Sequence, residues 1–205
     1  MHKSRKPLLK RIASDLSINL KLLEAEVNIG AKGSTSDETR YAKVKIVSEY
    51  IEKHLDVGSI DAPSTYFKGT LLMQYVFLEE DEVVYFGSVT PQTVVGLGGS
   101  LKHVIGSTRA ENNRQPNSTL YALLRVFQSV SDSNFSFETT NPQNIERVKD
   151  TGLRLIERVT MHITHRQKIG QQLEFLAKTL IQGPLPHYHH PYVVLGTPIY
   201  VAIND

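Results

Sequence analysis

The sequence predicts an α+β fold, in which a mainly antiparallel sheet packs against helices in one domain spanning residues 1–205. Two observations carry this prediction. Runs of β-branched and aromatic residues, separated by short polar turns, fill the middle of the chain as they do in antiparallel hairpins. Apolar residues at helical spacing precede and follow these runs, so helices are expected to cover the sheet.

The composition excludes several classes of protein. The 205 residues include 23 basic and 21 acidic ones, and the formal net charge of +2 predicts no general attraction to nucleic acid or to a membrane surface. The chain has no cysteine, which excludes disulfides, thiolate zinc sites and a cysteine nucleophile. The basic start "MHKSRKPLLKRIASDL" is not followed by a long apolar stretch, so we expect no membrane span and a cytoplasmic location.

Three elements are predicted before residue 60. A helix is expected from the spacing of Leu8, Leu9, Ile12 and Leu16, and a half-buried strand from the alternation over 23–29. Thr35 and Glu38 have the spacing of a capping box that opens a second helix. The apolar stripe of that helix is Tyr41, Val44, Val47, Ile51 and Leu55.

The segment 66–89 predicts an antiparallel hairpin whose tip is the acidic cluster 79–82, which is typical of a solvated turn. "TVVGLG" at 93–98 supplies a third strand. Since lysine and arginine do not alternate with the aromatic residues of these strands, we interpret them as core rather than as a platform for nucleic-acid bases. They are Tyr66, Phe67, Tyr75, Phe77, Tyr85 and Phe86.

The C-terminal half predicts mainly helix. One helix is marked by Tyr121, Leu124 and Phe127, with a cap near Ser118. Asn141 before Pro142 opens a long helical segment over 142–183, which Gly152 and Gly170 would bend or split. "GPLPHYHHP" ends this segment, and "YVVLGTPIYVAI" predicts one or two closing strands.

The stretch "VVGLGGSLKHVIGSTR" at 94–109 is the candidate binding site. Glycines behind a strand let backbone N–H groups approach an anion, while basic side chains supply charge. The spacing fits neither a P-loop nor the dinucleotide-binding fingerprint, whose third glycine is replaced by Leu101. The alternative is a tight turn at Gly98 and Gly99 with Ser100 capping a short helix. The candidate ligand-binding residues are Gly96, Gly98, Gly99, Ser100, Lys102, His103 and Arg109.

Five of the eight histidines lie late in the chain, at positions 162, 165, 187, 189 and 190. His162 and His165 would point to similar sides of a helix, but no HExxH pattern joins them. "HYHH" at 187–190 is expected in a surface loop. We therefore assign no metal site to these residues.

Five segments resemble an uncharacterised family of small bacterial proteins, some of them encoded near proposed conflict or defence systems. The segments are "YFKGTLLMQ", "VVYFG", "VVGLGGSLKHVIG", "LEFLAKTLIQG" and "VVLGTPIYVAI". The resemblance implies a bacterial cytoplasmic setting and a defence context, and it assigns no catalytic residue.

Three functional hypotheses follow from the sequence. The leading one is a non-enzymatic sensor or accessory protein that binds a small anionic or nucleotide-like ligand, or a partner protein, at 96–109. The second is a hydrolase or nuclease-like enzyme that uses His103 with acids the sequence does not identify. The third is a structural module that forms a homo-oligomer through its long C-terminal helix. No cofactor is identified.

Overall fold

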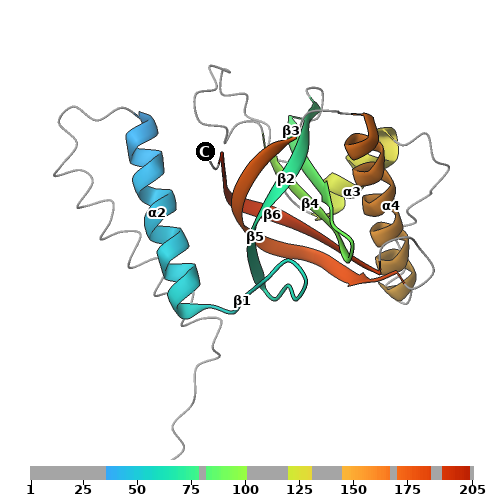
Figure 1. Ribbon diagram of the computed structural model, residues 1–205, viewed down its shortest axis with the longest axis horizontal. Coiled ribbons are helices and arrows are strands. Elements are labelled where there is room, and N and C mark those ends of the chain that lie inside the picture. The colour runs from blue at the N-terminus through green and yellow to red at the C-terminus, as the bar shows by residue number, and fades with distance from the viewer. Residues whose placement is uncertain are drawn as a thin grey trace, which may run out of the picture. The chain divides into compact units, whose positions relative to one another are not determined.

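The computed structural model describes residues 36–78, 82–100, 120–130, 145–166, 170–185 and 191–203 (Figure 1). The predicted helix at 8–16 and strand at 23–29 lie outside these residues. The chain divides after Val47 into two units, each considered by itself. The helices are α2 (Ser36–His54), α3 (Leu120–Val130) and α4 (Ile145–Arg166). The strands are β1 (Val57–Gly58), β2 (Tyr66–Leu78), β3 (Val83–Val89), β4 (Thr93–Ser100), β5 (Gln171–Pro184) and β6 (Tyr192–Ile203).

The central strands confirm the predicted hairpin. β2 and β3 pair antiparallel from Gln74–Gly87 to Leu78–Val83, and β3 pairs antiparallel with β4 over its whole length. Glu82, which directly precedes β3, adopts a left-handed φ of 54°, as tight turns often require. The sequence pattern therefore predicts the pairing of residues 74–78 with 83–87 and the third strand that begins at Thr93.

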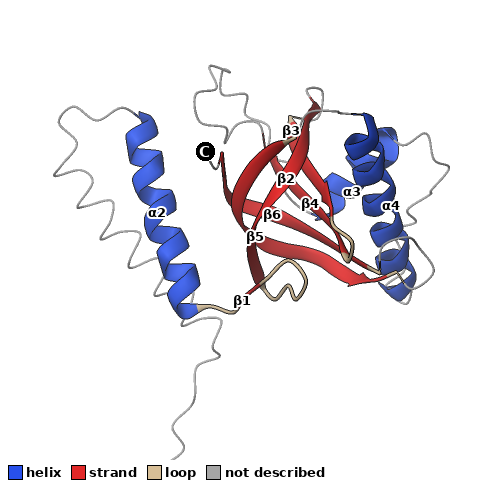
Figure 2. Ribbon diagram, viewed as in Figure 1, coloured by secondary structure: helices blue, strands red, loops and turns tan. Residues whose placement is uncertain are grey.

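The sheet closes into a small barrel (Figure 2). Its strand order is β1-β2-β3-β4-β6-β5, and β2 also pairs with β5. The long β2 strand makes closure possible because residues 66–73 pair with β5, whereas residues 74–78 pair with β3. The sheet is mixed rather than purely antiparallel, since β4 runs parallel to β6 and β1 runs parallel to β2.

The connectivity of the five barrel strands is that of the OB-fold, a five-stranded Greek-key barrel. The order β2-β3-β4-β6-β5 returns to β2, and α3 and α4 connect the third barrel strand to the fourth. OB barrels commonly bind oligomeric ligands on the face of their second and third strands. Here α4 packs on β3 and β4, so much of the corresponding face is covered.

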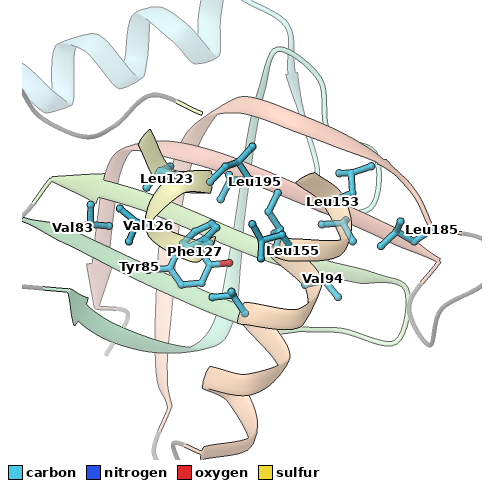
Figure 3. Close-up of a cluster of buried hydrophobic side chains, with 14 residues drawn as sticks. Val83, Tyr85, Val94, Leu123, Val126, Phe127, Leu153, Leu155, Leu185 and Leu195 are labelled. Atoms are coloured by element: carbon cyan, nitrogen blue, oxygen red, sulfur yellow. The ribbon is translucent and has the colours of Figure 1, made fainter. Parts of the chain in front are cut away.

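Two apolar clusters lie on opposite faces of the barrel wall. The first fills the interior with Phe67, Met73, Val95, Leu97, Leu173, Phe175, Ala177 and Val194, all buried. The second lies between the outer face and the helices, where the Tyr85 and Phe127 rings meet edge to face at 4.7 Å (Figure 3). The helix layer is thereby fixed to the barrel by apolar burial.

The prediction of helix from 169 to 183 is wrong. Helix α4 ends at Arg166, and residues 171–184 form β5. Leu173, Leu176 and Leu180 mimic helical spacing because β5 is covered on both faces along part of its length, where Phe175, Leu176 and Ala177 are all buried. The C-terminal segment forms one continuous strand, which passes through Pro198 with irregular register against β5.

Candidate functional site

The glycine stretch is part of a strand, which corrects the prediction of a tight turn at Gly98 and Gly99. Gly96, Gly98, Gly99 and Ser100 all lie in β4, and every residue of this strand is buried. Ser100 pairs with Val83 of β3, and the residues that directly follow it lie outside the described residues. The remaining candidate residues, Lys102, His103 and Arg109, lie outside the described residues.

Two of the glycines make room for side chains of the outer core. A Cβ atom on Gly96 would lie 2.3 Å from the Tyr85 hydroxyl oxygen. A Cβ atom on Gly98 would lie 2.6 Å from both terminal methyl groups of Leu123 in α3. Both distances are too short for real contacts, so glycine at these positions is explained by close packing alone.

Gly99 has a different environment. A Cβ atom here would meet Pro198 at 3.4 Å and Val84 at 3.7 Å, which are ordinary van der Waals distances. The registers of β2, β3 and β4 place Phe77, Val84 and Gly99 in one cross-strand row. Alanine would therefore fit at Gly99, and close packing does not explain why glycine stands there.

An aromatic cluster lies at the same end of the barrel. Phe77 is 49% exposed. Its ring meets that of Tyr75 at a centroid distance of 5.5 Å and an angle of 67°. The ring centroids of Tyr75 and Phe86 lie 6.0 Å apart. We call Tyr75, Phe77, Val84, Phe86 and Gly99 the Phe77 end of the barrel. The prediction that all these aromatic residues belong to the core fails for Phe77.

The β4 backbone continues past one of its two neighbours at this end. Its parallel register with β6 stops at Leu97–Gly196, whereas its antiparallel register with β3 continues to Ser100. Pro198 follows two residues later in β6 and has no N–H group to donate. Gly98, Gly99 and Ser100 thus extend beyond the β6 ladder.

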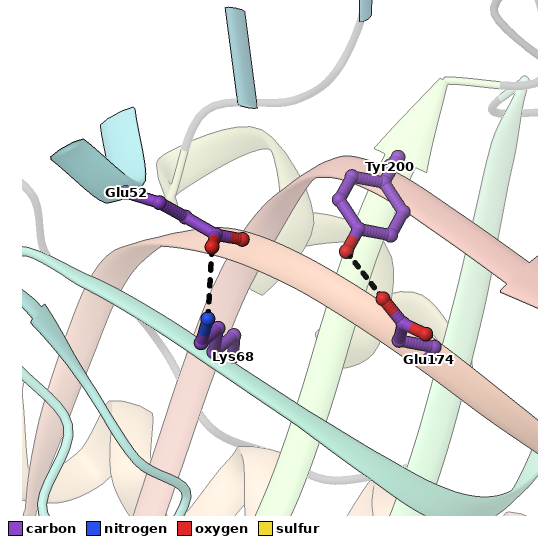
Figure 4. A network of polar contacts seen from close by, with 4 residues as sticks. All are labelled: Glu52, Lys68, Glu174 and Tyr200. Carbon is purple, nitrogen blue, oxygen red and sulfur yellow. Dashed lines mark hydrogen bonds and ion pairs between the residues drawn. The ribbon is translucent and has the colours of Figure 1, made fainter. Parts of the chain in front are cut away.

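A polar network occupies the outer face of the barrel, where β2, β5 and β6 lie side by side (Figure 4). Lys68 Nζ lies 2.9 Å from Glu52 Oε2, and the Tyr200 hydroxyl donates to Glu174 Oε1 at 2.7 Å. Partial burial raises the pKa of Tyr200, and the Glu174 carboxylate and the charge of Glu52 raise it further. The network keeps the Tyr200 phenol protonated and joins the last turn of α2 to β2.

The described histidines form no metal site. His162 and His165 are both exposed on α4, and no group of three or more potential ligands is placed to hold a metal ion within the described segments. The positions 187, 189 and 190 lie outside them, as do acidic residues 79–81. Among the helices that the structure describes, none is long and apolar enough to cross a membrane.

Sequence reasoning placed the candidate site in the glycines and missed the exposed Phe77 ring. One signal was present, since Phe77 is the penultimate residue of a strand that the sequence follows with four acidic residues. The side chains at strand ends lie at the rim of a barrel, where they are less covered than those in its middle.

The whole chain, residues 1–205, matches the Family of unknown function (DUF7019), and the protein belongs to that family. This agrees with the resemblance to an uncharacterised family that the sequence shows. No curated protein and no solved structure matches the chain.

Proposed function

We propose that the protein is a sensor or accessory protein rather than an enzyme, and that it binds a small anionic or nucleotide-like ligand at the Phe77 end of the barrel. The observation that carries this proposal is the extension of Gly98, Gly99 and Ser100 beyond the β6 ladder, where Gly99 stands in a row with the half-exposed Phe77 ring. The resemblance to an uncharacterised family of small bacterial proteins adds a cytoplasmic setting and a defence context to the proposal.

Each part of a nucleotide-like ligand has a counterpart at this end. An exposed aromatic ring offers a face on which a planar base can stack, typically worth about 1–3 kcal/mol per base. The T-shaped contact with Tyr75 holds the Phe77 ring in place before any ligand arrives. Gly99 adds no side chain to the same row, so the part of the row beyond Val84 carries no further side chain.

The charge for binding an anion would come from the chain that follows β4. Ser100 is the last residue of the strand, and Lys102, His103 and Arg109 follow within nine positions. A guanidinium group binds phosphate through paired N–H donors, which makes Arg109 the residue whose loss should weaken anion binding most.

The test is thermal unfolding against nucleotides, cyclic nucleotides and inorganic phosphate. A ligand at 100 times its dissociation constant adds about 2.7 kcal/mol to the free energy of unfolding. Phe77→Ala and Arg109→Ala should each reduce the shift in melting temperature. Leu72→Ala is the matched control. Leu72 is a 56% exposed apolar residue on the same strand, and its side chain lies on the opposite face from that of Phe77.

Glycine variants test the backbone part of the site. Gly98→Ala is a poor test, because the collision with Leu123 lowers stability whether or not a ligand binds. Gly99→Ala fits the fold, so a reduced ligand shift in this variant would place the ligand beside Gly99 rather than report a loss of stability. If every compound shifts the melting temperatures of Phe77→Ala and Leu72→Ala equally, the site is not at the Phe77 end of the barrel.

The other hypotheses predict different results. If no compound changes the melting temperature, a partner protein becomes the better occupant of this end, since Phe77 presents an exposed apolar surface. A hydrolase or nuclease-like enzyme requires turnover that His103→Ala abolishes while binding persists. A homo-oligomer requires a molecular mass in solution of at least twice the 23.0 kDa of the single chain.

A further inference from the structure

Helix α4 is held in a fixed rotation on the barrel. Leu153, Ile156, Val159 and Thr160 are buried against the outer core, and the Thr160 hydroxyl lies 2.5 Å from that of Tyr85. The opposite side of the helix is therefore displayed in a defined orientation rather than as a freely turning surface.

Four nitrogen-bearing side chains follow one another along that opposite side. Arg154, Arg158, His162 and His165 are all exposed. Their spacing of four, four and three residues places them on one face of an α-helix, along about 16 Å of its axis. We call these four residues the α4 stripe.

The α4 stripe offers hydrogen-bond donors and little negative charge. A guanidinium group is a donor only, and an imidazole carries at least one N–H donor in either charge state. The carboxylate beside the stripe is Asp150, which pairs with Arg154 at 2.7 Å, whereas Glu157 is buried. Arg158 is exposed and forms no ion pair with any residue that the structure describes.

We propose that the α4 stripe is a docking surface for an acidic peptide segment of a partner protein. Charge complementarity selects a partner rich in carboxylates, which accept hydrogen bonds from arginine in paired geometry. This surface is separate from the Phe77 end and does not depend on the proposed ligand.

A peptide fits the stripe better than a nucleic acid does. Binding to DNA is dominated by the neutralisation of many phosphates by lysine and arginine, and the stripe contains only two arginines. Arginine and methionine are enriched at protein interfaces, where lysine is depleted. The half-buried Met161 lies between Arg158 and His162 in sequence, and the stripe contains no lysine.

The test measures binding of a fluorescein-labelled octaglutamate peptide to the full chain by fluorescence anisotropy at low ionic strength. Arg158→Glu should weaken binding at least tenfold, because it reverses the charge of an exposed arginine in the middle of the stripe. Lys149→Glu is the matched control, since Lys149 is an exposed cation of the same helix that lies near Gly183 and off the stripe. It makes the same change in net charge and should alter the affinity less than twofold.

Three results would overturn the proposal. If octaglutamate does not bind the wild-type chain, the α4 stripe does not recognise acidic peptides. Equal losses in Arg158→Glu and Lys149→Glu would mean that binding follows net charge rather than the stripe. A labelled single-stranded oligonucleotide that binds more tightly than octaglutamate, and loses affinity in Arg158→Glu alone, would make the stripe a nucleic-acid surface.

Discussion

The hydroxyl oxygens of Tyr85 and Thr160 lie 2.5 Å apart, and this hydrogen bond joins strand β3 to helix α4 where both side chains are fully buried. Thr160 already donates to the carbonyl oxygen of Ile156 at 2.7 Å, so Tyr85 is the donor between the two hydroxyl groups. Seventy-five residues separate the partners in sequence. The bond therefore fixes how the helix layer sits on the barrel.

The first prediction concerns the asymmetry of this bond. Tyr85→Phe removes a donor and should lower the free energy of unfolding by about 1 kcal/mol. Thr160→Val keeps the shape of the side chain but leaves the buried Tyr85 donor without an acceptor, which should cost about 1–3 kcal/mol. Chemical denaturation of both variants and of the double variant measures the difference. A Thr160→Val variant that is no less stable than Tyr85→Phe would contradict the assigned direction of the bond, and a double variant less stable than the sum of the two single effects would mean that the two hydroxyl groups do not stabilise one another.

The second prediction concerns stability at alkaline pH. Burial raises the pKa of Tyr85 well above its ordinary value. In the unfolded chain the same phenol loses its proton near pH 10. Above that pH the native state therefore holds more protons than the unfolded state, and stability falls as the pH rises.

The contribution of Tyr85 to this fall is at most about 1.4 kcal/mol per pH unit. Denaturation midpoints measured between pH 8 and pH 11, roughly spanning the ordinary tyrosine pKa, should therefore decline more steeply for the wild type than for Tyr85→Phe. Parallel declines would show that the Tyr85 phenol ionises as easily in the folded protein as in the unfolded chain.

The third prediction separates packing glycines from the glycine of the candidate site. Gly96→Ala places a methyl group against the Tyr85 hydroxyl and should cost about 1–3 kcal/mol, as overpacking does. Gly99→Ala, three positions away on the other face of β4, should change stability by less than about 0.5 kcal/mol. Thermal unfolding of both variants measures the contrast.

A second background tests the cause of the Gly96 effect. Tyr85→Phe removes the nearest atom to the new methyl group, so Gly96→Ala should cost less in the Tyr85→Phe protein than in the wild type. An equal cost in both backgrounds would mean that the backbone at Gly96, and not the Tyr85 hydroxyl, excludes the alanine.

The local patterns predicted the strands between 66 and 100 because period-two runs between polar turns have few alternative conformations. The same reasoning failed at β5, where the residues around Leu176 are buried on both faces and the alternation disappears. The local patterns could not predict barrel closure either. Closure depends on the pairing of β2 with β5, which lies far along the chain, as well as with its neighbour β3.

The candidate site was predicted only in part. Glycines after an apolar run indicate a close approach to the backbone, but they do not reveal whether a ligand or a side chain makes that approach. Gly96 and Gly98 prove to face Tyr85 and Leu123, and each contact becomes visible only when β3 and α3 are in place. The room for a methyl group at Gly99 and the exposure of Phe77 likewise become visible only when the strands are in place.

The fourth prediction concerns the polar network on the outer face. Partial burial is the largest cause of the raised pKa of Tyr200, followed by its hydrogen bond to Glu174, the charge of Glu174 and the charge of Glu52. Glu174→Gln keeps an oxygen acceptor but removes the nearest negative charge, so the pKa of Tyr200 should fall while staying above its ordinary value. Glu52→Gln should lower it less. The difference in tyrosinate absorbance between each protein and its Tyr200→Phe counterpart isolates this phenol during an alkaline titration. If Glu52→Gln moves the titration more than Glu174→Gln does, the 2.7 Å hydrogen bond does not control the proton on Tyr200.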